Sequence, residues 1–195
     1  MNKVTGVVLA GGLARRMNNQ DKGLVIYHNR PMVSYAVDAL SKVAAPVFIN
    51  ANRNLAEYRQ FSCQVITDKT DTFDGPLAGI LSAMEYVNSG DLIVMPCDSP
   101  LIKAKHLQKL LDALSDEKID IAVAFDGERM HPVFLALRSD LRQSLEKYLA
   151  GGDRKIILWL KQHRLVTVDF KDHAEVFLNI NTLSELDALE NSRDE

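Results

Sequence analysis

Two kinds of hydrophobic pattern alternate along the chain. The first consists of short, nearly uninterrupted apolar runs, several of which end at glycine, proline, asparagine or aspartate. Runs of this length are typical of strands that are buried on both faces of a sheet. The pattern predicts extended segments at Val4–Ala10, Leu24–Tyr27, Pro46–Asn50, Gln64–Thr67, Leu92–Met95, Ile119–Phe125, Val133–Leu137 and Leu165–Asp169.

Between these runs, apolar residues recur every three or four positions, which places them on one face of a helix. Pro31 opens the first such segment, and a first helical position needs no N–H donor. Gly90 is suited to end the second helix. The predicted helices are Pro31–Leu40, Leu77–Val87, Ala104–Leu114, Asp140–Leu149 and Lys155–Leu160, and Thr182 with Glu185 forms a capping box for a last one.

This alternation predicts a three-layer α/β fold, with a mostly parallel sheet and helices on both faces. The 195 residues suit a single domain spanning 1–195, because no linker or repeat divides the chain. In such sheets, ligands bind beyond the carboxyl ends of the strands. The glycine pair Gly11–Gly12 and the polar residues Asn50, Asp68 and Asp98 follow the four expected parallel strands. We therefore expect the functional site at this edge.

The turn after the first strand predicts a phosphate site. Gly11 and Gly12 can adopt positive φ and let a ligand approach the backbone closely. Arg15, Arg16 and Lys22 follow, and cations beside turn amides favour phosphate. The spacing fits neither the dinucleotide fingerprint nor the P-loop. One of the two arginines can equally be a solvated side chain.

Asp98 is the strongest candidate for a metal ligand. It follows a buried strand, and a carboxylate there suits Mg²⁺, which takes oxygen ligands and keeps several waters. The alternative is a purely structural role in a turn or at a helix N-terminus. Lys22 is a candidate to contact phosphate and to stabilise its negative charge.

Composition narrows the class of protein. A net charge of −3 and the absence of a basic run argue against a nucleic-acid partner. The only two cysteines, Cys63 and Cys97, lack metal-ligand spacing and are expected to be buried free thiols in a reducing compartment. No signal peptide or membrane-spanning segment is evident, so a cytoplasmic location is expected.

An ordered series of motifs extends through the whole chain. The series begins with residues 9–17 and the segment Asp21-Lys22-Gly23-Leu24. The further motifs are Asn50-Ala51-Asn52-Arg53, Gly75-Pro76-Leu77-Ala78-Gly79, Pro96-Cys97-Asp98-Ser99-Pro100, His131-Pro132, Gly152-Asp153-Arg154-Lys155 and Asn179-Ile180-Asn181-Thr182. This series resembles the MobA family of molybdenum cofactor guanylyltransferases. One departure is the pair Asn18 and Asn19, where the family usually has glycines.

The resemblance implies a Rossmann-like nucleotidyltransferase fold and a role for each matching residue. Lys22, Asp98 and Arg16 would be catalytic, with Asp98 holding Mg²⁺. The nucleotide would be bound by Leu9, Ala10 and Gly11 through their backbone, and by Lys22, Asn50, Asp68 and Asp98. The acceptor would be bound by Gly12, Arg16, Gly79, Arg154, Asn179 and Asn181. Turn, cap or first-turn helix roles are the alternatives for Asn50, Asp68, Arg154, Asn179 and Asn181.

The reaction implied is transfer of GMP from GTP to the phosphate of molybdopterin, with release of pyrophosphate. The resemblance also implies transient contacts with other cofactor biosynthesis proteins and with chaperones of the target enzymes. Two alternatives are a nucleotidyltransferase that uses CTP, another NTP or a sugar-phosphate acceptor, and a non-catalytic nucleotide sensor. Asp98 together with Lys22 argues against a sensor, which has no need of a metal beside a leaving group.

Overall fold

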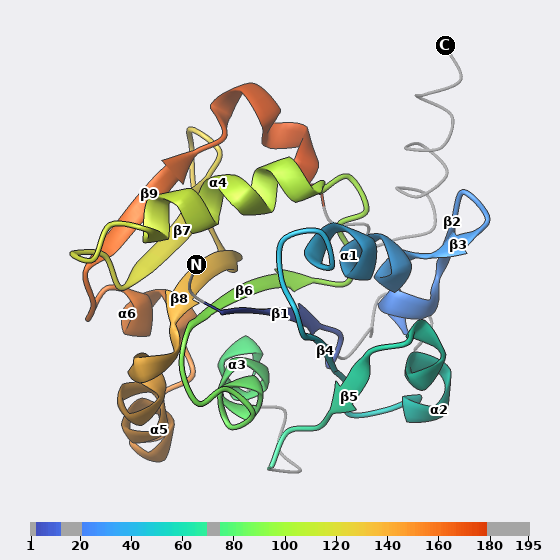
Figure 1. Ribbon diagram of the computed structural model, residues 1–195, viewed down its shortest axis with the longest axis horizontal. Helices are drawn as coiled ribbons and strands as arrows, with labels where there is room; N and C mark the ends of the chain where they lie inside the picture. Colours follow the sequence, from blue (N-terminus) through green and yellow to red (C-terminus); the bar gives the residue numbers. More distant parts are fainter. Residues whose placement is uncertain (1–2, 13–20, 70–74, 179–195) are drawn as a thin grey trace.

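The computed structural model describes residues 3–12, 21–69 and 75–178, and within these ranges the chain is built around a seven-stranded sheet. The strand order is β5-β4-β1-β6-β8-β7-β9 (Figure 1). β8 is antiparallel to β6 and β7, whereas the other neighbours pair in parallel. The strands are β1 Val4–Leu9, β4 Val47–Asn50, β5 Gln64–Ile66, β6 Asp91–Pro96, β7 Ile121–Phe125, β8 Met130–Arg138 and β9 Leu165–Asp169. The predicted mostly parallel sheet is confirmed.

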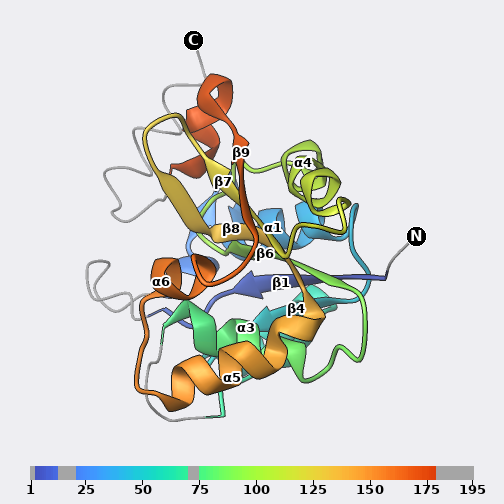
Figure 2. The ribbon, with the colours of Figure 1, turned by 90° about the vertical axis from the view of Figure 1, so that its left-hand side faces the viewer.

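Helices cover both faces of this sheet (Figures 1 and 2). The helices α1 (Met32–Leu40) and α4 (Ala104–Leu114) pack into one hydrophobic core, and α3 (Pro76–Met84), α5 (Arg142–Ala150) and α6 (Ile156–Leu160) into the other. Successive residues of β6 enter opposite cores, Ile93 the first, Leu92 and Val94 the second. Burial on both faces explains the uninterrupted apolar runs, since strand side chains alternate in direction. The predicted three-layer arrangement is confirmed.

Short elements complete the described part of the chain. A hairpin joins β2 (Ile26–Tyr27) to β3 (Arg30–Pro31), where Leu24–Tyr27 was predicted to be extended. Its turn residues His28 and Asn29 have φ of 43° and 61°. Neither is glycine, so the usual sequence signal for such a turn is missing. The remaining short elements are the single-turn α2 Leu55–Tyr58 and the 3₁₀ segments η1 Lys22–Leu24, η2 Arg59–Phe61, η3 Ser139–Leu141 and η4 Lys171–Phe177.

Some element boundaries differ from the predictions. β8 begins at Met130 rather than Val133, because it forms a hairpin with β7. The register of this pair shifts between Val123 and Ala124, and the irregularity accommodates Pro132, which has no N–H to donate. α3 ends at Met84 and not at Val87. The predicted capping box of Thr182 and Glu185 lies outside the described residues.

The carboxyl ends of the first four parallel strands are tied together by backbone hydrogen bonds. The amide of Ala10 donates to the carbonyl of Asn50 at 2.8 Å, and that of Cys97 to the carbonyl of Leu9 at 3.1 Å. The amide of Ala51 donates to the carbonyl of Ile66 at 3.0 Å. The loops that leave these strands therefore start side by side at one edge of the sheet.

Candidate functional site

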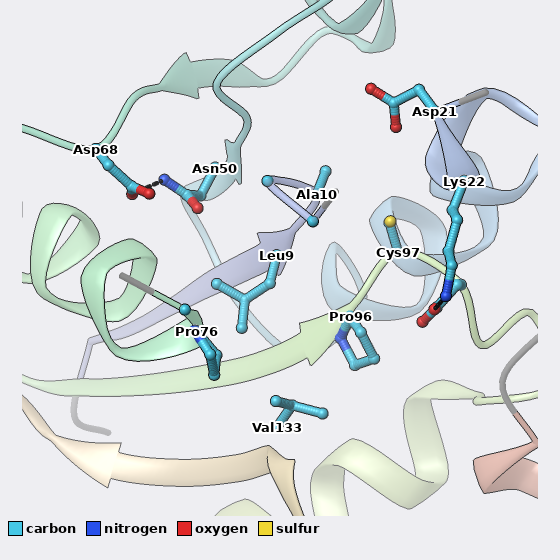
Figure 3. Close-up of a pocket in the computed structure, with 14 residues that line it drawn as sticks. Leu9, Ala10, Asp21, Lys22, Asn50, Asp68, Pro76, Pro96, Cys97 and Val133 are labelled. Atoms are coloured by element: carbon cyan, nitrogen blue, oxygen red, sulfur yellow. Dashed lines mark hydrogen bonds and ion pairs between the residues drawn. The ribbon is translucent and has the colours of Figure 1, made fainter. Parts of the chain in front are cut away.

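A pocket of about 330 Å³ opens at this edge (Figure 3). Eight of the predicted site residues line it: Leu9, Ala10, Gly11, Gly12, Lys22, Asn50, Asp68 and Asp98. The remaining lining residues are Asp21, Gly75, Pro76, Pro96, Cys97 and Val133. The topology thus brings together residues as far apart in the sequence as Leu9 and Val133.

The missing side chains of Gly11 and Gly12 affect packing and open space at the turn, and not its backbone conformation. Neither Gly11 nor Gly12 has a positive φ, so the left-handed backbone that glycine permits is not used at this turn. A Cβ on Gly11 would lie 3.1 Å from Nδ2 of Asn52, whereas one on Gly12 would meet no atom of the described residues within 4 Å. Gly11 therefore permits close packing, and Gly12 leaves open space at the pocket.

Fewer backbone groups are available to a ligand than the sequence suggests. The carbonyl of Leu9 accepts from Cys97 and the amide of Ala10 donates to Asn50, so both are engaged in the sheet. Leu9 presents its side chain to the pocket between Pro76 and Pro96 (Figure 3). With Val133, these side chains form an apolar part of the pocket lining.

Asn50 and Asp68 form one hydrogen-bonded unit. Nδ2 of Asn50 donates to Oδ1 of Asp68 at 2.9 Å, and Nδ2 of Asn52 donates to Oδ2 at 2.7 Å. The backbone amide of Asp68 donates in turn to Oδ1 of Asn52 at 2.9 Å. Asn50 is only 3% exposed, so its orientation is held by this unit rather than by solvent. The pair presents preorganised polar atoms to the pocket.

Gly79 lies in α3 and does not line the pocket itself. A Cβ there would stand 2.3 Å from Oδ1 of Asn50 and 2.9 Å from Cδ2 of Leu9, closer than real Cβ atoms approach. The missing side chain lets α3 pack directly against two pocket residues. Its predicted contact with the acceptor stays a prediction, but its packing role is evident.

We predict that Gly79→Ala weakens nucleotide binding by displacing Asn50. A gain of about 1 kcal/mol in helix propensity opposes an overpacking cost of about 1–3 kcal/mol. The free energy of unfolding is therefore expected to fall by up to about 2 kcal/mol, as measured by urea denaturation. Calorimetry with GTP reports the effect on the pocket. Gly12→Ala, where the Cβ meets open space, is the control for stability, and an unchanged affinity in Gly79→Ala would contradict the prediction.

Lys22 and Asp98 form an ion pair in the lining of the pocket. Nζ of Lys22 lies 3.1 Å from Oδ2 of Asp98, and the side chain extends from η1 into the pocket past Cys97 (Figure 3). The two side chains are 25% and 11% exposed, so the ion pair is partly shielded from water. A cation next to a carboxylate at a strand end is the arrangement expected where a polyphosphate and a metal bind together.

The other carboxylate oxygen of Asp98, Oδ1, is the atom that is available to bind a metal. Oδ1 is buried and has no hydrogen-bond partner among the described residues. An unpartnered buried carboxylate oxygen is costly, and a bound cation removes that cost. No group of three acidic, histidine or cysteine side chains in the described ranges could form a complete metal cage.

Residues assigned no role by the sequence also shape the pocket. Asp21 and Cys97 flank Lys22 and Asp98, and Gly75 has a φ of 75° at the start of α3. Asp21, Cys97 and Gly75 each belong to one of the sequence motifs named above, and these motifs were the signal that could have identified them. Val133 belongs to none of these motifs. Cys97 is buried and Cys63 is half-buried, which corrects the expectation that both are buried. Burial raises the pKa of the Cys97 thiol well above its usual value.

Arg154 is not among the residues that line the pocket. It is exposed, and its Nη1 donates to the carbonyls of Leu149 and Asp153 at 2.7 and 2.9 Å, close to the end of α5. The geometry gives it a local structural role, and its proposed acceptor contact stays a prediction. Four predicted phosphate or acceptor residues lie outside the described ranges: Arg15, Arg16, Asn179 and Asn181.

Comparison with known proteins matches most of this chain to one family. A sequence model described as the MobA-like NTP transferase domain matches residues 6–166. Curated relatives named molybdenum cofactor guanylyltransferase include one from Shewanella sediminis, 42% identical with 92% of each chain covered. Another, from Shewanella putrefaciens, is 41% identical with 93% of each chain covered. The family resemblance inferred from the motifs is confirmed.

Solved structures support the fold. The molybdopterin-guanine dinucleotide biosynthesis protein A from Archaeoglobus fulgidus superposes with a TM-score of 0.81 at 21% identity, covering 97% of this chain and 98% of that one. The 4-diphosphocytidyl-2C-methyl-D-erythritol synthase from Anaerococcus prevotii gives a TM-score of 0.75 at 10% identity, covering 100% and 99%. At these identities the likeness concerns the fold alone. In the described ranges, no helix is long and apolar enough to cross a membrane.

Proposed function

Because the chain belongs to the MobA-like NTP transferase domain family, we propose that it is a molybdenum cofactor guanylyltransferase. It transfers GMP from GTP to the phosphate of metal-loaded molybdopterin, and pyrophosphate leaves. The observation that carries the proposal is the Lys22–Asp98 pair at the strand-end pocket, with Oδ1 of Asp98 left unpartnered among the described residues. The single domain 1–195 and the cytoplasmic location stay predictions from the sequence.

The reaction needs positioning and charge neutralisation more than proton transfer. The acceptor phosphate is already a nucleophile, so no strong general base is required. Its oxygen attacks the α-phosphorus of GTP, and the bond to the bridging oxygen of the pyrophosphate breaks. The ammonium group of Lys22 stabilises negative charge on the triphosphate. This negative charge increases on the leaving group as the bond breaks.

Mg²⁺ fits the donor set of Asp98 and, when bound, would neutralise negative charge on the phosphates. Asp98 would hold it through Oδ1, while Oδ2 stays paired with Lys22. The shared carboxylate would keep the ammonium group of Lys22 close to the phosphates. The choice of Mg²⁺ over other divalent ions belongs to the proposal.

The two ends of the pocket suit different parts of the nucleotide. The buried Asn50–Asp68 unit supplies hydrogen-bonding atoms for the base or the ribose, and Leu9 and Pro76 supply apolar surface. Gly12 provides open space for a phosphate near the pocket mouth. On the acceptor side we retain Arg16, Gly79, Arg154, Asn179 and Asn181 as candidates. Transient contacts with other cofactor biosynthesis proteins and with target-enzyme chaperones stay a prediction of the resemblance.

The test is nucleotide selection followed by product formation. Thermal shift with GTP, CTP, ATP and UTP in the presence of Mg²⁺ is expected to give the largest stabilisation with GTP. A ligand at one hundred times its Kd adds about 2.7 kcal/mol. Incubation with GTP and molybdopterin should then yield the guanine dinucleotide and pyrophosphate by chromatography. Preferential stabilisation and turnover with CTP would replace the proposal by a cytidylyltransferase, and binding without turnover by a nucleotide sensor.

A further inference from the structure

The turn that carries Lys22 is anchored by a second carboxylate, that of Asp21. Oδ1 of Asp21 accepts from the hydroxyl of Tyr58 at 2.5 Å and from the amide of Gly23 at 3.3 Å. Oδ2 accepts from Nδ2 of Asn54 at 3.1 Å and lies 3.4 Å from Nε of Arg53. The side chain is only 3% exposed. Both oxygens of Asp21 therefore have partners, whereas Oδ1 of Asp98 has none among the described residues.

These contacts join the turn that carries Lys22 to the glycine turn and to α2. Arg53 donates through Nη2 to the carbonyl of Gly12 at 3.1 Å, so Asp21 is connected through Arg53 to the glycine turn. Tyr58, which is fully buried in α2, holds the carboxylate from the other side. Burial and the neighbouring Asp21 and Cys97 raise the pKa of Tyr58, so its hydroxyl stays a donor.

The segment after Asp21 has little freedom to move. A Cβ on Gly23 would lie 2.5 Å from the hydroxyl oxygen of Tyr58 and 3.2 Å from Sγ of Cys97. η1 is thus packed between α2 and the end of β6, with Asp21 as its N-terminal cap. Lys22 lies between Asp21 and Gly23, which are both held by these contacts, so its long side chain starts from a constrained backbone position.

We propose that Asp21 is a positioning residue, which acts through Lys22 by holding η1, the Gly12 turn and α2 in the geometry that places the ammonium group on Asp98. The inference rests on the proposed function, because it assigns Lys22 to the triphosphate. Asp21 does not act as a metal ligand, since its oxygens already accept three hydrogen bonds and form an ion pair with Arg53. Loss of the Asp21 charge therefore weakens nucleotide binding by displacing Lys22, and not by removing a direct contact with the nucleotide.

A double-mutant cycle tests this proposal. Asp21→Asn, Lys22→Ala and the double variant are compared with the wild type by calorimetry, using Mg²⁺ and the nucleoside triphosphate that stabilises the wild type most. Asp21→Asn is expected to weaken binding about 10-fold in the wild type and less than about 2-fold in the Lys22→Ala background. Equal losses in both backgrounds, or no loss in the wild type, would overturn the proposal.

Two further variants separate positioning from general stability. Tyr58→Phe removes one donor to Asp21 without changing the packing, so it should show a smaller loss with the same dependence on Lys22. It takes the place of Asp21→Asn if circular dichroism shows that the latter is unfolded, and additivity then overturns the proposal. Asp126→Asn, at a carboxylate 13% exposed and outside the pocket, should show no coupling to Lys22.

The readout also keeps this proposal distinct from the proposed function. A wild type that binds its nucleotide but forms no molybdopterin guanine dinucleotide would contradict the proposed function. The affinity cycle between Asp21 and Lys22 would still give its answer, because it does not depend on the acceptor.

Discussion

Asp98→Asn is expected to lower kcat by at least about 100-fold, the equivalent of about 2.7 kcal/mol of transition-state stabilisation, while the protein still folds. The substitution keeps the size of the side chain but removes the charge that pairs with Lys22 and that would hold a cation at Oδ1. A neutral amide binds a divalent cation far more weakly than a carboxylate does. The measurement is steady-state turnover of GTP and molybdopterin at saturating Mg²⁺.

The control for this experiment lies at the other end of the same strand. Asp91 is also buried and pairs with Arg138 at 3.3 Å, on the edge of the sheet away from the pocket. Asp91→Asn should lower the melting temperature more than Asp98→Asn does, because it leaves a partly buried guanidinium with fewer partners. Its kcat should stay close to that of the wild type. A near-normal kcat for Asp98→Asn would instead assign Asp98 to the turn.

Lys22→Ala is expected to weaken GTP binding and to slow transfer together. The ammonium group meets phosphate charge that is present in the ground state and grows in the transition state, so both Kd and kcat should change. Its loss also leaves the Asp98 carboxylate facing the triphosphate without a counter-charge. A charge-assisted hydrogen bond contributes about 1.5–3 kcal/mol, so kcat/KM should fall by about 10- to 150-fold.

Two further variants define what Lys22 contributes. Lys22→Arg keeps the positive charge but replaces a compact ammonium group by a planar fork, so it should recover GTP affinity more fully than kcat. Lys161→Ala removes an exposed lysine outside the pocket and should change neither quantity. An unchanged GTP affinity in Lys22→Ala, measured by calorimetry, would remove Lys22 from the triphosphate site.

The hydrophobic pattern alone was sufficient for the architecture. Strands such as β1 and β6 are buried on both faces, and their apolar runs are therefore uninterrupted. Helix α4 was predicted with its observed bounds because its apolar residues keep one helical face. The pattern failed where local sequence carries little signal, as in the β2–β3 hairpin, whose turn contains no glycine. The single-turn α2 was missed because four residues are too few to show a period.

What the sequence by itself determined is the identity of the chemical groups at the strand ends, because the carboxyl ends of parallel strands share one edge of a sheet. It named Lys22, Asn50, Asp68 and Asp98, but not which atoms of them are free to bind a ligand. Only the tertiary structure decided that, by pairing Oδ2 of Asp98 with Lys22 and leaving Oδ1 without a partner among the described residues. It also separated two carboxylates of the same pocket that look alike in sequence. Asp21 has its oxygens engaged by α2 and by its own turn, so the contacts of distant segments, and not residue type, set the role of each acid.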